Sequence, residues 1–352
     1  MIKNFKIGSK KIDYSKKPYV IAEISANHGG SLNKCYKLID FIAKAGADAV
    51  KIQTYKPDSI TIKCKRNEFL IKNLEDNWDN TYLYDIYKKS CLPWSWIEKL
   101  KLYCQKKKIF FFSSVFDEEG LLFLENLNLG AYKISSFEFN HYPLIKSILK
   151  TKKPIIFSTG VSDYTEIKKV NNYVRKFSNN YAILHCVSSY PAKIENYNLN
   201  ILDKLKKDLK VIIGISDHTE DNILASLAAS RGAKIFEKHV KLDDDITSTD
   251  SHFFLPVSKL KDYIYSVNAA WKLSNKNALD LDVKKKYSKY KRSIYIIKDL
   301  KKNQKIKKKD LKIIRPANGL DPIYFENVIG KTAIKNLKAP RPLKLNDITE
   351  KI

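Results

Sequence analysis

The sequence is poor in cysteine and has neither a long apolar run nor an apolar segment near its first residue. Its 352 residues include five cysteines, an odd number, and no Cys-x-x-Cys pair, which argues against a disulfide framework and against a zinc ribbon. The longest strongly apolar run, residues 109–116, is far shorter than the roughly 20 residues that cross a bilayer. The first ten residues contain no signal-peptide core. We therefore expect a cytoplasmic protein that does not enter a membrane.

Acidic residues are also scarce. The chain has 38 Asp and Glu against 65 Lys and Arg, a formal net charge of +27, and such an excess suggests a nucleic acid or an anionic membrane as a partner. However, residues 283–352 hold 21 of the basic and only 6 of the acidic residues. We expect a solvated basic surface there and no nucleic-acid partner. A basic nucleic-acid-binding protein, whose affinity would fall steeply with salt, is a remote alternative.

Eight short apolar runs alternate with segments of helical periodicity, such as residues 35–46 and 223–232, each of which ends in glycine. Buried parallel strands have this continuous Val, Ile and Phe character. The alternation predicts a parallel (β/α)8 barrel, with a doubly wound sheet as the alternative. The expected strands are 19–24, 49–53, 109–114, 131–135, 155–159, 182–187, 211–215 and 234–238.

Two segments interrupt this rhythm. Residues 56–93 follow the second strand, are too long for a plain loop and contain Trp78 and three tyrosines. They predict either a helical cover packed on the barrel rim or a substrate lid. Residues 273–292 are polar and lack apolar periodicity, so they predict a linker. We expect a barrel over residues 1–272 and a small domain of short strands and turns over residues 293–352.

Polar residues at the carboxyl ends of barrel strands are the catalytic candidates. Lys51 and Lys133 interrupt two buried strands, and several other strands end in Ser or Thr. Ammonium and hydroxyl groups together suit a dense anion such as a phosphate or a carboxylate. The alternative is that both lysines extend to the rim and bind nothing.

His218 and His239 end neighbouring strands, so both imidazoles can reach one ion. With water and a nearby Asp217, Asp250 or Glu23, they suit Mn²⁺, Fe²⁺ or Zn²⁺. A structural role for both histidines is the alternative. His185 lies inside an apolar strand and is expected to be structural.

Glu23 and Glu138 lie at the ends of apolar strands, where an unpaired carboxylate is costly. Either can move a proton at an attacking water or at a sugar hydroxyl. A Ser216-Asp217-His218 relay is excluded, because consecutive strand residues point in alternating directions.

Several segments resemble the sialic acid synthase (NeuB-like) family, which condenses phosphoenolpyruvate with an N-acetylated amino sugar. They are IAEISANHGGSL (21–32), AGADAVKIQTYKPDSIT (45–61), AYKISSFE (131–138), STG (158–160), SYPA (189–192), IGISDHT (213–219) and EKH (237–239). IIRPANGLDP (313–322) is similar to the family's C-terminal antifreeze-like (SAF, β-clip) domain. The resemblance therefore implies an α/β fold, a TIM barrel followed by a SAF domain.

Within the family, three segments are most similar to the pseudaminic acid synthases. They are Ser-Ala-Asn-His at 25–28, residues 77–96 with their Tyr and Trp pattern, and Thr-Ser-Thr-Asp-Ser at 247–251. The implied acceptor is 2,4-diacetamido-2,4,6-trideoxy-L-altrose, with N-acetylneuraminate or N,N'-diacetyllegionaminate synthesis as alternatives. A metal-dependent barrel aldolase is a more distant alternative function. The sequence departs from the family at Val115, where the family has proline. This replacement removes no polar group.

The resemblance also implies roles for individual residues. The catalytic set is Glu23, Glu138, His218 and His239, and the two histidines hold a divalent metal, Mn²⁺ or alternatively Mg²⁺ or Co²⁺. Arg315 of one subunit reaches the partner's barrel in a domain-swapped homodimer, and Lys51, Lys133, Lys238 and Arg315 are expected to face the anionic substrate. Phosphoenolpyruvate binds Lys51, Ser114, Lys133, Ser136, Ser158, Ser188 and Ser216, and the sugar binds Asn27, Gln53, Tyr190, Asp250 and Arg315.

Overall fold

The computed structural model describes residues 5–72, 78–245, 254–275 and 281–349. The chain divides into two compact units, Met1–Asn275 and Lys276–Ile352. Each unit has its own hydrophobic core, and each is described here by itself. None of the helices in the described ranges combines the length and the apolar character needed to cross a membrane.

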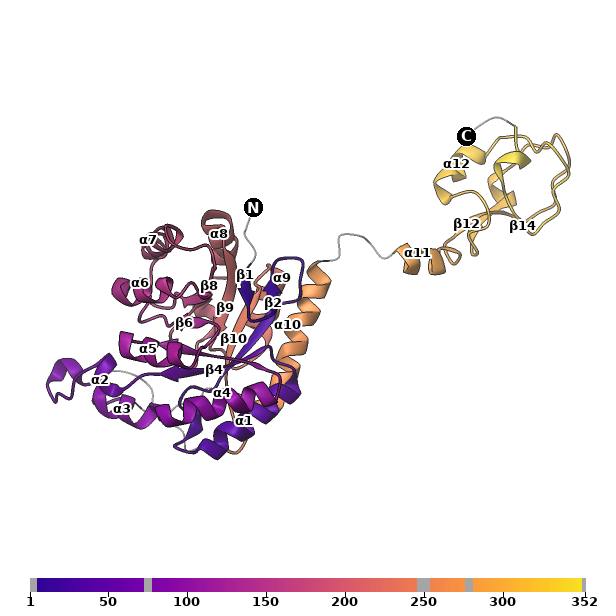
Figure 1. The fold of residues 1–352 in the computed structure, drawn as a ribbon. Helices are drawn as coiled ribbons and strands as arrows, with labels where there is room; N and C mark the ends of the chain where they lie inside the picture. The colour runs from indigo at the N-terminus through magenta and orange to yellow at the C-terminus, as the bar shows by residue number, and fades with distance from the viewer. Residues whose placement is uncertain (1–4, 73–77, 246–253, 276–280, 350–352) are drawn as a thin grey trace. The chain divides into compact units, whose positions relative to one another are not determined.

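The first unit is a closed barrel of eight parallel strands (Figure 1). The last strand pairs with both its predecessor and the first, with His239 opposite Glu23 in register. This closure confirms the predicted barrel, and the doubly wound alternative is wrong. The strands are β3 (Tyr19–Glu23), β4 (Ala49–Thr54), β5 (Phe110–Val115), β6 (Tyr132–Ile134), β7 (Ile155–Ser158), β8 (Tyr181–Cys186), β9 (Ile212–Asp217) and β10 (Ile235–Lys241).

Helices pack around the outside of the barrel (Figure 1). The first shows why they form: Ser31 caps its amino end by accepting from the Lys34 amide, and Gly46 ends it with a φ of 88°. Its buried residues lie at helical spacing and face the strands. The covering helices are α1 (Leu32–Ala45), α4 (Ile97–Lys106), α5 (Glu118–Asn126), α6 (Tyr142–Lys150), α7 (Tyr164–Arg175), α8 (Asn200–Leu209), α9 (Ile223–Ser230) and α10 (Leu260–Ser274).

Side chains alternate between the barrel interior and the helical layer. On β3, Tyr19 and Ile21 belong to the interior cluster, whereas Val20 and Ala22 belong to the outer one. Apolar residues fill the lower interior, toward the amino ends of the strands. The upper interior is polar, and this is where the site lies.

An unpredicted hairpin closes the amino-terminal end of the barrel. It consists of β1 (Phe5–Ile7) and β2 (Lys10–Ile12), paired antiparallel. Phe5, Ile7 and Ile12 are buried against the lower interior cluster. The hairpin therefore acts as an apolar plug below the polar floor of the site.

We expect Phe5→Ala to lower the free energy of unfolding by about 3 kcal/mol, because it empties a buried aromatic position. Phe41→Ala on α1 is the matched control, since Phe41 is 48% exposed, and it should cost less than about 1 kcal/mol. Chemical denaturation of the full chain measures both. Equal effects of the two substitutions on the free energy of unfolding would contradict the role of the hairpin as an apolar plug.

Residues 56–93 contain the helices α2 (Pro57–Ile60), η2 (Asn67–Phe69) and α3 (Leu83–Ser90). Tyr84 on α3 donates to Asp58 on α2 at 3.2 Å, and the His28 ring lies 3.2 Å from the Ser90 carbonyl oxygen. The described part of this excursion is thus a helical cover anchored on the barrel, and several of its side chains reach the cavity described below.

The second unit is a small three-stranded sheet with its own core. Its strands are β12 (Ser293–Ile296), β13 (Leu311–Ile314) and β14 (Arg341–Pro342). A Cβ on Gly319 would lie 2.5 Å from the Ile294 carbonyl oxygen, so the glycine of the Arg-Pro-x-x-Gly pattern permits a close backbone approach. The unit also has the helices α12 (Phe325–Val328) and α11 (Leu281–Ser288), the latter within the segment expected to be a linker.

Candidate active site

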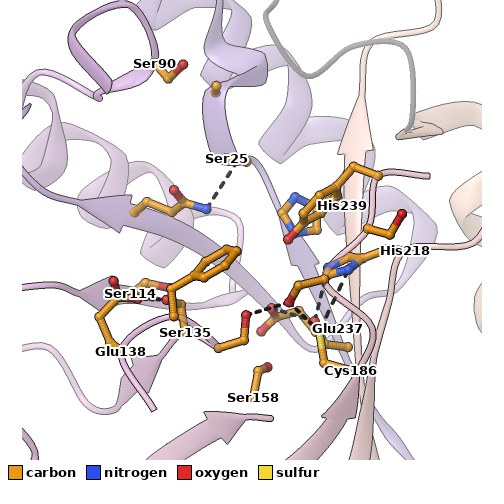
Figure 2. Close-up of a pocket in the computed structure, with 18 of the residues that line it drawn as sticks. Ser25, Ser90, Ser114, Ser135, Glu138, Ser158, Cys186, His218, Glu237 and His239 are labelled. Carbon is orange, nitrogen blue, oxygen red and sulfur yellow. Dashed lines mark hydrogen bonds between the residues drawn. The ribbon is translucent and has the colours of Figure 1, made fainter. Parts of the chain in front are cut away.

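A cavity of about 1080 Å³ opens at the carboxyl ends of the barrel strands. Figure 2 shows His218, His239 and Glu237 on one side of it, and Ser114, Ser135 and Glu138 on the other. Most of the residues that the sequence predicted for the site line this cavity. They are Lys51, Gln53, Ser114, Lys133, Ser136, Glu138, Ser158, Ser188, Tyr190, Ser216, His218 and His239.

Strand alternation decides which residues at the strand ends face the cavity. On β10, Glu237 and His239 line it, whereas Lys238 points outward. Lys238 pairs with Asp217 at 3.1 Å and lies over the Tyr263 ring at 5.3 Å. The expectation that Lys238 faces the substrate is therefore wrong.

The floor of the cavity carries three buried charged side chains, those of Lys51, Lys133 and Glu237. A fourth, the predicted catalytic Glu23, is fully buried beside them and does not line the cavity. Lys51 forms an ion pair with Glu23 and lies 3.6 Å from Glu237. Lys133 lies 3.7 Å from the same Glu237 oxygen. Lys51 also donates to Ser114 Oγ at 2.9 Å. The two lysines thus share one carboxylate, and they do not extend to the rim as the alternative interpretation required.

Sequence reasoning assigned no role to Glu237. The signal was its position two residues before His239 on one strand, which puts both side chains on the same face. Burial acts to raise the pKa of this carboxyl, but Lys133 and Lys51 outweigh it and lower the pKa. Glu237 is therefore the carboxylate that holds both ammonium groups in position.

The other three groups respond to the same surroundings. Burial lowers the pKa of Lys133, and Glu237 compensates only in part. Burial disfavours the charged form of Lys51 too, but Glu23 and Glu237 raise its pKa overall. Burial raises the pKa of Glu23 despite the neighbouring Lys51. The floor is thus balanced in charge, and Lys133 is the ammonium that gains most from an arriving anion.

Hydroxyl groups surround the lysines. Ser136 Oγ and Ser188 Oγ lie 2.7 Å apart. Within the described residues, the buried Ser158 Oγ has no hydrogen-bond partner. Donors held in this way over two ammonium groups suit a phosphate or a carboxylate.

The two histidines lie next to each other, with ring centroids 5.2 Å apart. His218 Nδ1 lies 2.8 Å from the Val187 carbonyl oxygen, an arrangement that leaves Nε2 as the lone-pair nitrogen. His239 Nδ1 is buried without a hydrogen-bond partner among the described residues, and burial lowers the pKa of this ring well below its usual value. His218 differs, because burial acts to lower the pKa of its ring but Cys186 outweighs burial and raises the pKa. Two adjacent imidazoles, one of them neutral and with an unsatisfied nitrogen, fit a divalent metal.

These histidines do not form a complete protein cage. In the described ranges, no three His, Cys, Asp or Glu side chains gather as a metal cluster. Asp250, proposed at the sugar, lies outside the described residues.

A cysteine lies beside the first histidine, with Cys186 Sγ 3.9 Å from His218 Nδ1. Burial alone would raise the pKa of Cys186, but His218 and Lys133 reverse this and lower it.

Glu138 lies across the cavity from the histidines and accepts from the Ser135 hydroxyl. Burial raises the pKa of Glu138 to about 7, although Lys133 acts in the opposite direction. Tyr87 from α3 also lines the cavity, and burial, with a smaller contribution from Glu138, raises the pKa of its phenol. A carboxyl with this pKa can give or take a proton near neutral pH.

The four predicted sugar residues that the structure describes divide into three groups. Gln53 and Tyr190 line the cavity, and Gln53 Nε2 donates to Ser25 Oγ at 3.3 Å. Asn27 is fully buried, donates to the Val240 carbonyl oxygen at 2.9 Å and is not on the cavity wall. Arg315 lies in the second unit, exposed and directly after β13.

Residues 38–278 match the model of the NeuB family, and residues 291–349 match that of the SAF domain. The pseudaminic acid synthases of Campylobacter jejuni and Helicobacter pylori are 38% and 35% identical to the chain, over 94% of it and 97% and 98% of their own length. The N,N'-diacetyllegionaminic acid synthase of Campylobacter jejuni is 33% identical over 92% of the chain and 98% of its own.

Solved structures share the fold as well. The N-acetylneuraminic acid synthetase of Leptospira borgpetersenii, in complex with citrate, superposes with a TM-score of 0.71 at 26% identity. The match covers 81% of this chain and 97% of that one.

Proposed function

The chain belongs to the NeuB family and is a synthase of the sialic acid class, and on this premise we propose that it makes pseudaminic acid. The proposed reaction condenses phosphoenolpyruvate with 2,4-diacetamido-2,4,6-trideoxy-L-altrose and water, and it releases phosphate. The higher identity to two pseudaminic acid synthases than to the legionaminic acid synthase supports this sugar. Diacetyllegionaminate and N-acetylneuraminate remain the alternative products. We place the reaction in the cytoplasm.

The observation that carries the proposal is the floor of the cavity. Lys51 and Lys133 lie beneath the two histidines, and the serines named above surround them. Phosphoenolpyruvate carries a phosphate and a carboxylate, which is the combination that two ammonium groups and several hydroxyls bind well. The open-chain sugar then lies above it, between His218 and His239 on one side and Glu138 on the other.

The chemistry begins when C3 of phosphoenolpyruvate attacks the sugar aldehyde. Glu138 gives its proton to the aldehyde oxygen as that bond forms, so the oxygen becomes a hydroxyl. His218 and His239 would hold the divalent metal, most simply Mn²⁺, which supplies Lewis-acid polarisation of the aldehyde when bound. Tyr190 packs on both histidine rings, at 4.3 and 6.1 Å between centroids, and keeps them oriented.

Attack by C3 leaves positive charge at C2 of the former phosphoenolpyruvate. Glu237 lines the floor and Glu23 lies behind it, and their carboxylates stabilise this charge. Water adds at C2 and loses a proton. Glu23 accepts it through Lys51, its ion-pair partner on the cavity floor, because burial raises the pKa of Glu23. The tetrahedral intermediate then collapses with cleavage of its C–O bond, and phosphate leaves.

The role of Glu138 predicts a pH dependence. Because its acid form is needed, turnover should fall as the pH rises through about 7. Glu138→Gln should lower kcat by about 10²–10⁴-fold and abolish this fall. Exposed Glu98 provides the control Glu98→Gln, which should retain wild-type kcat. A wild-type kcat that stays flat from pH 6 to 8 would exclude Glu138 as the proton donor.

A second proposal concerns a shared site. We propose a domain-swapped homodimer in which Arg315 reaches the sugar in the partner's barrel. Arg315→Ala should then raise KM for the sugar at least about tenfold, through loss of a charged hydrogen bond. At sugar concentrations well below KM, an equal mixture of Arg315→Ala and inactive His218→Ala subunits should regain about a quarter of wild-type activity, because half of the dimers then carry one intact site. The absence of any recovery would refute the swap.

Phosphate release from phosphoenolpyruvate tests the proposed function directly. The acceptors are the L-altrose derivative, the matching 2,4-diacetamido-2,4,6-trideoxymannose and N-acetylmannosamine. We expect release only with an acceptor, and fastest with the first. Condensation of pyruvate without phosphate release would instead indicate a barrel aldolase. Salt-sensitive binding to DNA or RNA without turnover would indicate a nucleic-acid-binding protein.

A further inference from the structure

The helical cover gives the cavity an apolar wall. Residues 57–90 contribute four aliphatic side chains to the lining, and we call this set the aliphatic wall: Ile60, Ile71, Leu83 and Ile86. Each is partly buried. Aliphatic groups neither donate nor accept hydrogen bonds, so this wall differs in chemistry from the lysine and serine floor.

The aliphatic wall belongs to the sugar half of the cavity. Trp78, from the same excursion, lies 6.3 Å from the Tyr190 ring, and Tyr190 packs on His218. Tyr87 on α3 lines the same cavity as Glu138. The excursion therefore meets the cavity beside the two groups proposed to act on the aldehyde, above the floor proposed for phosphoenolpyruvate.

The cover is built to hold this wall in place. Besides the Tyr84–Asp58 and His28–Ser90 contacts, Leu70 and Tyr82 form a β-bridge. Tyr55, at the end of β4, packs edge-on against Tyr87 at 5.9 Å and against Phe116 at 5.1 Å. A wall anchored at several points can discriminate between groups that differ by one atom.

We propose that the aliphatic wall selects the acceptor by its methyl groups, and in particular by a C6 methyl in place of a hydroxymethyl. This inference rests on the proposed function. A methyl group gains free energy by leaving water for an aliphatic surface. A hydroxyl in contact with these aliphatic side chains loses its water partners and finds no replacement among them. An apolar surface of this kind discriminates by no more than about 100-fold.

The test compares two acceptors that differ only at C6: the 2,4-diacetamido-2,4,6-trideoxy sugar and its 6-hydroxy counterpart. The wild type should prefer the deoxy sugar by about 10–100-fold in kcat/KM. Ile86→Thr, which places a hydroxyl on the wall, should reduce this preference at least about threefold and leave KM for phosphoenolpyruvate unchanged. Leu83→Asn is a second wall variant, in case the first does not fold.

The matched control is Ile62→Thr, the same change in the same excursion. Ile62 is 57% exposed and does not line the cavity, so the preference should stay at the wild-type value. An equal wild-type rate with both acceptors would overturn the inference and leave the proposed function standing. So would folded wall variants that keep the full preference. Failure of every acceptor to release phosphate would overturn the proposed function, and the inference with it.

Discussion

His218→Ala should lower kcat/KM by at least about 10³-fold, which corresponds to about 4 kcal/mol of transition-state stabilisation. Two effects combine in this change. One of the two imidazoles proposed to hold the metal is lost, and the aldehyde loses its electrostatic activation. Chelation of the wild type should have the same effect, and added Mn²⁺ should restore the chelated wild type but not the variant.

A readout independent of turnover separates a metal ligand from a structural histidine. Titration calorimetry should show Mn²⁺ binding to the wild type that is lost in His218→Ala, while both unfold at similar temperatures. The control is His141→Ala, because His141 is exposed at the start of α6, away from the cavity. Unchanged Mn²⁺ affinity in His218→Ala would contradict the assignment of His218 as a metal ligand.

Lys133→Met should raise KM for phosphoenolpyruvate by about 10–100-fold, since a charged hydrogen bond contributes about 1.5–3 kcal/mol. Methionine is unbranched and only one atom shorter than lysine, and it removes the ammonium group with its charge and its three donors. Lys133 is a cleaner target than Lys51. Removal of Lys51 would leave Glu23 without its ion-pair partner, whereas Glu237 would keep Lys133. An unpaired buried carboxylate destabilises the fold.

The control for Lys133 is Lys193, which also lines the cavity but is exposed. Lys193→Met should change KM for phosphoenolpyruvate less than about threefold, because water screens its charge. Steady-state kinetics with phosphoenolpyruvate varied at saturating sugar measures both variants. Equal effects from Lys133→Met and Lys193→Met would mean that the anion binds at the rim and not on the floor.

The barrel could be predicted from the sequence because its strands are buried on both faces and are therefore continuous apolar runs. The lysines stood out for the same reason, since Lys51 and Lys133 break such runs. The hairpin did not stand out, because β1 and β2 have three residues each and contain lysines. A strand of this length carries almost no periodic signal.

The two errors of assignment at the site have one cause. Lys238 was expected to face the substrate and Glu237 was given no role, although the opposite is seen. Strand alternation says that Glu237 and His239 point to one side of β10 and Lys238 to the other. It does not say which side faces the barrel interior. The assignment of His239 as a metal ligand would have settled this, because it places Glu237 inward and Lys238 outward. The aliphatic wall had no such guide, because it comes from an irregular excursion without a strand register.

The central claim is that phosphoenolpyruvate on the lysine floor loses its phosphate by C–O cleavage after its C3 has attacked the sugar. Phosphoenolpyruvate labelled with oxygen-18 in the C–O–P bridge tests it most directly. Mass spectrometry of the products should find the label in the released phosphate and none in the nine-carbon sugar acid. Label retained in the organic product would show P–O cleavage and contradict the account.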